Sequence, residues 1–320
     1  MVENILLIIA GFFLLIKGAD ILVEGSCYIA KKFRIPEIIV GLTIVSIGTS
    51  MPELMVSITS AMENHADVAL GNVIGSNICN LLLILGLSSI IQPVEFKKET
   101  KFIEIPMTML IIFTMFLLGN NGDIDKYITR PEGIILIILF ICFLIYTIFM
   151  AKYGNDFDGQ EELNNDKEKS MNLIKSIIFI ICGIVALKFG GDFVVDSACE
   201  IAKAIGISEK VISLTIIAIG TSLPELITSV TAAIKGDSDI AIGNILGSNI
   251  FNFLLIIGTS AIISPVHYSV DYNIDMMILF IATTLLMLFP YIGKKNQMTK
   301  SNGIIYFIGY VLYMCSLFVR

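Results

Sequence analysis

The sequence is poor in charged residues and in histidine, and both shortages exclude functions. Only 15% of the 320 residues are charged, and the net charge is −7, so no basic surface for nucleic acid is expected. The two histidines, His65 and His267, fall in predicted loops. The apolar segments therefore contain no histidine that could act as a catalytic base. They also contain no GxGD motif, so we predict neither an intramembrane hydrolase nor another enzyme.

The six cysteines lack the paired CxxC spacing that marks many metal and redox sites. All of them lie in apolar segments, at positions 27, 79, 142, 182, 199 and 315. A cysteine in such a segment usually behaves as a small buried hydrophobic residue. We therefore predict packing roles for all six.

Long apolar stretches, in contrast, recur along the whole chain. Hydrophobic residues make up 56% of it, a composition typical of membrane proteins. A helix needs about 20 apolar residues to cross a bilayer. Ten such spans are predicted, at residues 5–30, 36–62, 67–92, 102–119, 132–151, 173–203, 209–234, 239–264, 273–292 and 302–319. The predicted fold is an all-α polytopic protein embedded in a lipid bilayer.

One polar passage occurs twice. The segment GTSMPE at 48–53 returns as GTSLPE at 220–225, and GNVIGSNICN at 71–80 returns as GNILGSNIFN at 243–252. Both copies are shifted by the same 172 residues, so no insertion separates them. A repeat that served only packing would preserve apolar character, but this one preserves oxygen atoms and helix breakers. The repeat therefore predicts a binding site.

The spacing of the repeat predicts its topology. Five predicted spans separate the two copies, an odd number, so the second copy must enter the membrane from the opposite side. This is the inverted-repeat architecture of many secondary transporters, whose substrate site lies near the midplane. We predict two five-helix repeats, at 1–151 and 173–320, joined by a polar linker at 152–172.

Lysine and arginine predict the orientation. With the N-terminus outside, most of these residues, such as Lys31, Lys97 and Lys294, fall in loops on the inner side. Cytoplasmic loops carry such an excess. We predict that both termini are extracellular and that the 152–172 linker is cytoplasmic.

Two glutamates dominate the chemistry of the repeat. Glu53 and Glu225 lie in the middle of apolar spans, where a carboxylate costs roughly 2.5–3.5 kcal/mol on insertion scales. Neither motif contains Lys or Arg, so a bound cation is the simplest compensation. The preceding residues, Pro52 and Pro224, each remove a backbone N–H and favour a broken turn with an exposed carbonyl. A structural carboxylate bonded to Ser or Thr is the alternative.

The GNxxGSNIxN element supplies further polar groups. Asn72, Ser76 and Asn80 are spaced by four and share one helical face, which Gly71 and Gly75 allow a neighbouring helix to approach closely. The equivalents are Asn244, Ser248, Asn252, Gly243 and Gly247.

The polar residues of this element divide into candidate ligands and candidate packing residues. Asn80 and Asn252 are either ligands or interhelical hydrogen-bonding residues. We expect the remaining amides to pack or to support the ligands: Asn72, Asn77, Asn244 and Asn249. For the repeat-related pair Asp20 and Asp192 we favour structural or vestibule roles.

The assembled donors are all oxygen, and they include two carboxylates. Ca²⁺ takes about 6–8 oxygen ligands, whereas the absence of thiolate and imidazole from the motifs argues against zinc, copper and iron. Two negative charges suit one divalent ion or more than one Na⁺ competing for the same oxygens.

These motifs resemble the α-repeats of the cation/Ca²⁺ exchanger superfamily, most closely those of Na⁺/Ca²⁺ exchangers such as the prokaryotic members. The resemblance covers both halves, with GTSxPE at 48–53 and 220–225 and GSNIxN at 75–80 and 247–252. It implies a secondary antiporter that exchanges Na⁺ for Ca²⁺ by alternating access, in which the long first and sixth helices slide across the core.

The resemblance also assigns ligands. It implies that Glu53 and Glu225 bind both Ca²⁺ and Na⁺, and that Asn80 and Asn252 occupy central polar positions. It further implies backbone oxygens from Ser46, Thr49, Ala218 and Thr221, and hydroxyl groups from Ser50, Ser76, Ser222 and Ser248.

The sequence departs from some members of this superfamily. Asn252 stands where K⁺-dependent members carry aspartate, which argues against K⁺ co-transport, and the short linker leaves no room for a regulatory Ca²⁺-binding insert. GTSxPE stands where Ca²⁺/H⁺ members carry a GNxxE-type element, which favours Na⁺. A Ca²⁺/H⁺ or other cation antiporter is the alternative, and a cation channel is a more distant one. We expect no cofactor and a functional monomer.

Overall fold

Helices account for almost all of the chain that the computed structural model describes, which is residues 2–63, 66–121, 126–153, 172–205, 218–292 and 296–317. Most of the predicted linker, the start of the predicted seventh span and His65 lie outside these ranges. Two short antiparallel ribbons are present among the described residues, one pairing β1 with β4 and the other β2 with β3.

The first half contains long helices interrupted by short π-helical turns, which are labelled η here. Its elements are α1 (Val2–Phe33), α2 (Glu37–Val40), η1 (Gly41–Val45), α3 (Ser46–Thr49), α4 (Met51–Met62), α5 (Ala66–Ile78), η2 (Cys79–Ile84), α6 (Leu85–Ile91), β1 (Val94–Glu95), η3 (Thr100–Glu104), α7 (Ile105–Gly119), β2 (Tyr127–Ile128) and α8 (Arg130–Tyr153).

The second half follows a similar order. Its elements are α9 (Leu173–Ala204), α11 (Ala218–Gly220), α12 (Leu223–Lys235), α13 (Ser238–Phe251), η7 (Asn252–Ile257), α14 (Gly258–Ile263), β3 (Val266–His267), α15 (Tyr272–Leu288), the 3₁₀ turn η8 (Phe289–Tyr291), β4 (Gln297–Met298) and α16 (Lys300–Leu317).

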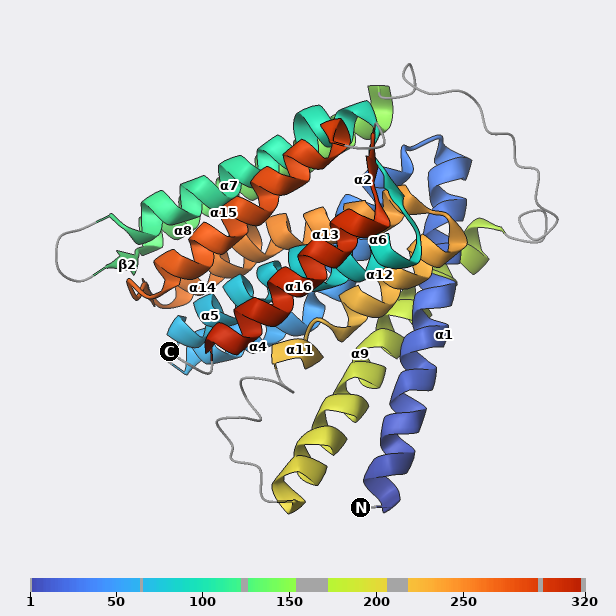
Figure 1. Ribbon diagram of the computed structural model, residues 1–320, viewed down its shortest axis with the longest axis horizontal. Helices are drawn as coiled ribbons and strands as arrows, with labels where there is room; N and C mark the ends of the chain where they lie inside the picture. Colours follow the sequence, from blue (N-terminus) through green and yellow to red (C-terminus); the bar gives the residue numbers. More distant parts are fainter. Residues whose placement is uncertain are drawn as a thin grey trace.

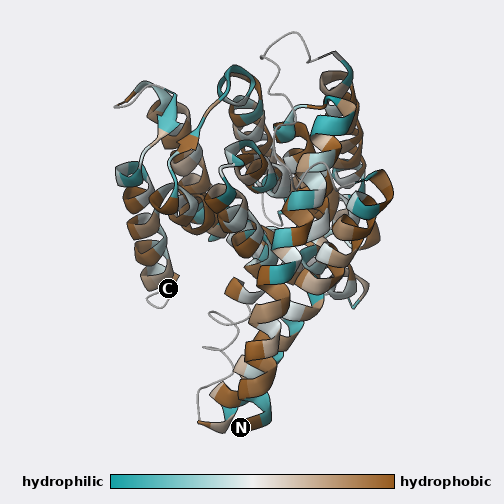
Figure 2. Ribbon diagram, turned by 90° about the vertical axis from the view of Figure 1, so that its right-hand side faces the viewer, coloured by the Kyte–Doolittle hydropathy of each residue, from teal (hydrophilic) through white to brown (hydrophobic). Residues whose placement is uncertain are grey.

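The outer surface of the helical body is apolar. Large side chains such as Phe13, Ile148 and Leu312 are more than half exposed, and apolar residues cover most of the helices (Figure 2). Seven of the described helices are long and apolar enough to cross a membrane, and the bent pair Glu37–Thr49 with Met51–Met62 is an eighth candidate. This is the build of an all-helical, multi-pass membrane protein.

The structure thus accounts for eight of the ten predicted spans. The predicted span 209–234 begins outside the described residues and continues as α12. The predicted span 302–319 corresponds to α16, which has 18 residues and is not among the candidates. The count of ten therefore stays a prediction.

The helices α1 and α9 form a close antiparallel pair that projects from the body (Figure 1). Small residues line their contact at intervals of seven. A Cβ on Gly11 would lie 2.8 Å from the Gly190 carbonyl oxygen, and one on Gly18 would lie 3.0 Å from that of Gly183. A side chain at these positions would separate the helices, so glycine sets their spacing.

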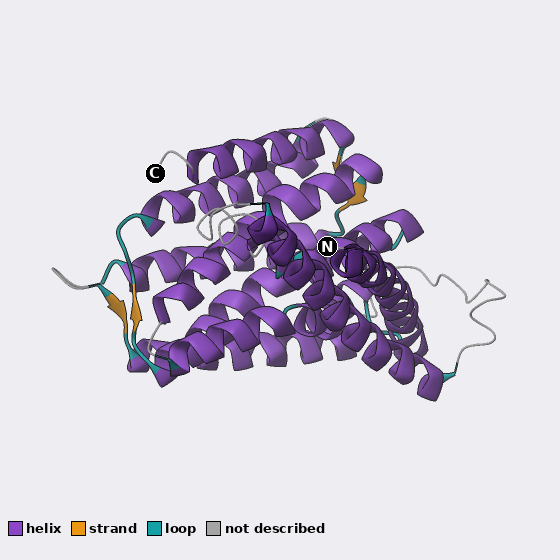
Figure 3. Cartoon of the chain, turned by 90° about the horizontal axis from the view of Figure 1, so that it is seen from below, coloured by secondary structure: helices purple, strands orange, loops and turns teal. Residues whose placement is uncertain are grey.

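The two ribbons lie at opposite ends of the helical body (Figure 3). Val94 of β1 pairs with Met298 of β4, and Ile128 of β2 pairs with Val266 of β3. Both ribbons therefore join a segment of the first half to a segment of the second.

The centre of the body is formed by α4 to α6 and α12 to α14 with their π-helical turns. Glycine again permits close packing here, because a Cβ on Gly243 would lie 2.6 Å from the Ile38 carbonyl oxygen and one on Gly247 would lie 2.6 Å from that of Leu42. This confirms the predicted close approach in the second half. No described atom lies within 4 Å of a Cβ built on Gly75, so its contact stays a prediction.

Candidate functional site

Each half contains a helix that is interrupted immediately before a glutamate. In the first half α3 ends at Thr49 and α4 begins at Met51, with a bend of 50° across the break. Pro52 stands at the start of α4, where it cannot donate a helical hydrogen bond to the Gly48 carbonyl. The second half breaks in the same way between α11 and α12, in front of Pro224. Both predicted breaks are present.

The breaks bring Glu53 and Glu225 into the interior. Each is only 1% exposed, and the two carboxylates are close enough to repel one another. Among the described residues, no Lys or Arg forms an ion pair with either of them. Two buried carboxylates without a cation would be strongly destabilising, so their surroundings favour a positively charged ligand.

Serine hydroxyl groups link the two halves around these glutamates. The Ser50 hydroxyl, at the first break, donates a hydrogen bond to Glu225 Oε1 at 2.7 Å and lies 2.9 Å from Ser248 Oγ. At the second break, Ser222 Oγ lies 3.4 Å from Ser76 Oγ. The four predicted serines are therefore brought together in two pairs, each of which crosses between the halves.

Four asparagines form a second link between the halves. Asn80 Nδ2 donates to Asn249 Oδ1 at 3.0 Å, and Asn252 Nδ2 donates to Asn77 Oδ1 at 2.9 Å. Asn80 lies in the π-helical turn η2 and Asn252 begins η7, and π-helical turns are frequent at functional sites. Since each amide nitrogen is held by the other half, each Oδ1 is turned away from that contact.

Four oxygen atoms of these glutamates and asparagines have no hydrogen-bond donor. They are fully buried and belong to two carboxylates and two amides: Glu53 Oε2, Glu225 Oε2, Asn80 Oδ1 and Asn252 Oδ1. Buried polar atoms without a partner are rare and call for an explanation such as an ion. All four are acceptors, so a cation would satisfy them and an anion would not.

The remaining predicted ligand positions are Ser46, Thr49, Ala218 and Thr221. The Ser46 carbonyl accepts the Ser50 N–H at 3.0 Å, and its hydroxyl donates to the Leu42 carbonyl at 2.8 Å. The Thr49 hydroxyl lies 3.0 Å from Asn244 Oδ1, and the Thr221 hydroxyl is buried without a partner. Ala218 is described only as the first residue of α11.

The supporting amides were expected from the sequence, but their pairing across the halves was not. Asn77 and Asn249 each hold the candidate ligand of the opposite half. Asn244 joins Thr49 to α12, because its Nδ2 donates to Ser229 Oγ at 2.9 Å. Only the presence of these amides in both copies of the repeat could have drawn attention to them.

The two repeat-related aspartates lie outside this centre. Lys188 Nζ lies 2.6 Å from Asp192 Oδ2 on the same helix. Asp20 of α1 pairs instead with Lys235 at the end of α12, at 2.5 Å. Both pairs are partly exposed, which fits the structural or vestibule role favoured from the sequence.

Comparison with known proteins gives a consistent result over almost the whole chain. The family described as "Sodium/calcium exchanger protein" matches residues 3–149 and 175–319. The "Putative antiporter CaxA" of Alkalimonas amylolytica is 35% identical over 97% of this chain and 97% of its own length. The "Sodium/calcium exchanger MaX1" of Methanosarcina acetivorans is 29% identical over 98% of both chains.

A solved structure is similar as well. It is described as the sodium-calcium exchanger NCX_Mj, soaked with 2.5 mM Na⁺ and 0.1 mM Ca²⁺. The TM-score is 0.83 at 30% sequence identity, and the match covers 99% of each chain.

Proposed function

Because this chain belongs to the sodium/calcium exchanger family, we propose that it is a secondary antiporter that exchanges Na⁺ for Ca²⁺ at one buried site. The observation that carries the proposal is the set of four buried oxygens without donors on Glu53, Glu225, Asn80 and Asn252. Two carboxylates and two amides form a hard, all-oxygen donor set of the kind that Ca²⁺ prefers. Membership of a transporter family agrees with the prediction that the chain is not an enzyme.

We propose that the site is built by two inverted five-helix repeats, 1–151 and 173–320. Contacts that exchange under the 172-residue shift support this arrangement. Gly183 is the repeat equivalent of Gly11, and Gly190 is the equivalent of Gly18. Replacing each residue of the contact Gly11–Gly190 by its equivalent therefore gives the contact Gly183–Gly18, which is also present. The β1–β4 and β2–β3 ribbons, at opposite ends of the body, are related in a similar way.

Within this arrangement, Glu53 and Glu225 supply the charge and Asn80 and Asn252 supply neutral oxygens to bound Ca²⁺. Water or backbone oxygens of Thr49 and Thr221 would complete a shell of about 6–8 ligands. The hydroxyls of Ser50, Ser76, Ser222 and Ser248 would serve Na⁺. The Ser46 carbonyl is a weaker candidate, because it already accepts the Ser50 N–H.

The choice of Na⁺ as the coupling ion is supported by hydroxyl groups beside Glu225 and at both helix breaks. A proton-coupled exchanger needs only a carboxylate that loses and gains a proton, whereas Na⁺ needs several oxygens around it. Four serine hydroxyl groups lie at the breaks and on the facing helices. Two relatives are named as sodium/calcium exchangers, and a third is named only as a putative antiporter.

Alternating access requires one part of the molecule to move against another. We assign the moving part to α1 and α9, whose main contact is with each other and which project from the body (Figure 1). We also propose that both termini are extracellular, that the 152–172 linker is cytoplasmic and that the protein functions as a monomer.

Flux measurements test the proposal. Protein reconstituted in liposomes should take up ⁴⁵Ca²⁺ when Na⁺ is loaded inside and absent outside, with no uptake when the Na⁺ gradient is removed. Uptake that follows a pH gradient and ignores Na⁺ would identify a Ca²⁺/H⁺ antiporter instead. Single-channel currents would identify a pore.

A further inference from the structure

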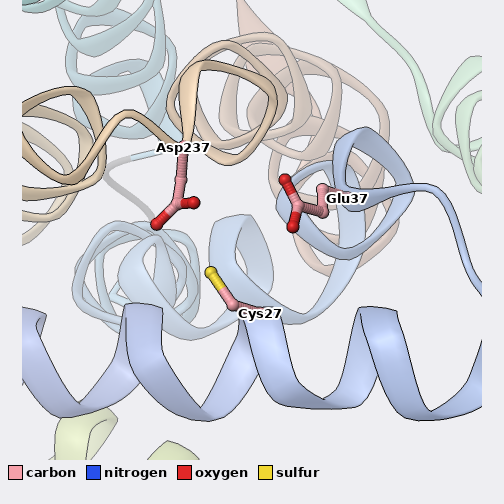
Figure 4. Close-up of side chains that lie close together, drawn as sticks. All are labelled: Cys27, Glu37 and Asp237. Carbon is pink, nitrogen blue, oxygen red and sulfur yellow. The ribbon is translucent and has the colours of Figure 1, made fainter. Parts of the chain in front are cut away.

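Three metal-ligating side chains from separate elements converge at a point away from the central site. They are Cys27 of α1, Glu37 at the start of α2, and Asp237 in the turn between α12 and α13. The Cys27 sulfur and one carboxylate oxygen of each acid all lie within 4.8 Å of one another. Figure 4 shows the sulfur pointing between the two carboxylates. All three residues are half-buried.

The local backbone fixes the position of Asp237. Helix α12 ends at Lys235, and the next residue, Gly236, adopts a left-handed conformation with φ of 87°. The Gly236 N–H then donates to Ala233 O at 3.1 Å and the Asp237 N–H to Ala232 O at 3.0 Å, the pattern of a Schellman motif. Asp237 precedes α13, yet its side chain makes no capping hydrogen bond to that helix. One of its carboxylate oxygens lies within 4.8 Å of the Cys27 sulfur.

The surroundings of Glu37 add negative charge. Glu37 begins α2 directly after Pro36, and Asp237 and Asp239 are the acids that act on it electrostatically. Lys31 and Lys97 are the opposing cations, and Lys97 is engaged with Asp239 at 2.8 Å. The cluster therefore has an excess of acidic groups, which attracts cations.

The other copy of the repeat has metal-ligating residue types at the equivalent positions. The equivalents of Cys27, Glu37 and Asp237, each 172 residues away, are Cys199, Glu209 and His65. The last two lie outside the described residues, so this is a correspondence of sequence alone. Cysteine, glutamate, aspartate and histidine are the usual protein ligands of Zn²⁺, so all six repeat-related positions carry residue types that can bind it.

We propose that Cys27, Glu37 and Asp237 bind a thiophilic divalent cation of the Zn²⁺ or Cd²⁺ class. One thiolate with two carboxylates suits such ions, with water in the fourth position. Ca²⁺ is not expected here, because it takes oxygen ligands and needs more of them. On binding, the sulfur–metal bond replaces the S–H bond and the proton passes to solvent, so affinity falls as the pH is lowered.

Such an ion would hold α1 against the central helices. Cys27 belongs to α1, whereas Glu37 and Asp237 belong to elements that pack on the central helices. The ion pair between Asp20 and Lys235 already joins the same two parts two turns earlier along α1. This consequence rests on the proposed function: if α1 moves against the core in each exchange cycle, bound metal inhibits the cycle.

Spectroscopy of purified protein tests the site independently of transport. Cd²⁺ titration should produce the ultraviolet charge-transfer absorption of a cadmium–thiolate bond, saturating at one ion per chain. The absorption should vanish in Cys27→Ser and require at least tenfold more Cd²⁺ in Glu37→Gln or Asp237→Asn. Cys182→Ser is the matched control, because Cys182 is exposed on α9, and should behave as wild type.

The site is overturned if wild type shows no such absorption, or if Cys27→Ser retains it. The double variant Glu53→Gln/Glu225→Gln should keep the absorption, since it alters only the central site. A failure of the proposed exchange function would therefore leave this measurement unchanged.

Flux then tests the restraint on α1. Saturating Zn²⁺ should lower Na⁺-driven ⁴⁵Ca²⁺ uptake at least tenfold in wild type and in Cys182→Ser, and should leave Cys27→Ser uninhibited. Equal inhibition of wild type and Cys27→Ser would overturn the restraint.

Discussion

The helices α13 and α14 differ from α1 and α9 in what their side chains face. In the span Ser238–Ile263, 94% of the most apolar stretch is buried, against 28% in α1 and 22% in α9. The first region turns amides and hydroxyls toward facing helices, whereas the second presents apolar side chains outward and glycine inward. Under the proposed function, the first region would supply fixed ligands that discriminate between ions, and the second would supply a smooth surface for movement.

The largest effect is expected at the two glutamates. Glu53→Gln or Glu225→Gln removes half of the negative charge of the central site, so exchange should fall by at least ~100-fold, which exceeds the loss expected when a supporting group is removed. Na⁺-dependent ⁴⁵Ca²⁺ uptake measures it. Glu104→Gln is the matched control, because Glu104 is also a fully buried carboxylate with an unpartnered oxygen but lies elsewhere, in η3. Equal loss in the control would show that the effect is not specific to the site.

The next effect is expected at the supporting amides. Asn77→Ala leaves Asn252 without the acceptor that orients it, and loss of an orienting partner typically lowers metal affinity about 10–100-fold. Isothermal titration of Ca²⁺ should show this for Asn77→Ala and for Asn249→Ala. Asn121→Ala, at an exposed position, is the control. Unchanged affinity in both variants would assign these amides to packing alone.

A substitution in the glycine-lined contact between α1 and α9 should slow the proposed movement of these helices without changing Ca²⁺ binding. In Gly18→Ala the new methyl group meets the Gly183 carbonyl at 3.0 Å, and overpacking costs typically about 1–3 kcal/mol. We expect the exchange rate to fall about tenfold, with Ca²⁺ affinity unchanged. Gly309→Ala is the control, since its nearest neighbours lie 3.8 Å away. If Ca²⁺ affinity falls together with the rate, the two regions are not separate.

The smallest effect is expected at the ion pair between Asp20 and Lys235. The pair is partly exposed, and such pairs are worth about 0.2–1 kcal/mol. Asp20→Asn should change the exchange rate less than about fivefold, with the difference disappearing at high salt. A larger change that persists in high salt would make this pair part of the mechanism.

The sequence predicted the central region better than the pair of helices α1 and α9. Glu53, Pro52 and their equivalents could be recognised because a carboxylate and a proline are costly within an apolar span and occur there twice. The hydrogen bonds of Asn80 to Asn249 and of Asn252 to Asn77 could not be predicted, since they depend on which residues of the opposite half face each other.

Two other features could not be predicted from the sequence, each for a different reason. The glycine seam of α1 and α9 is visible in the sequence only as isolated glycines, because the antiparallel register that pairs Gly11 with Gly190 is set by tertiary packing. The packing role predicted for all six cysteines misses the surroundings of Cys27. Its neighbours are Glu37, at the start of the next helix, and Asp237, which lies in a turn of the other half of the chain.

The central claim is that Ca²⁺ and Na⁺ compete for the four buried oxygens of Glu53, Glu225, Asn80 and Asn252. Equilibrium binding of ⁴⁵Ca²⁺ to the purified protein over a range of Na⁺ concentrations tests it most directly. We expect a single Ca²⁺ per chain, displaced completely by Na⁺ in wild type and absent from Glu53→Gln/Glu225→Gln. Ca²⁺ that remains bound at saturating Na⁺, or that binds the double variant as tightly as wild type, would contradict the account.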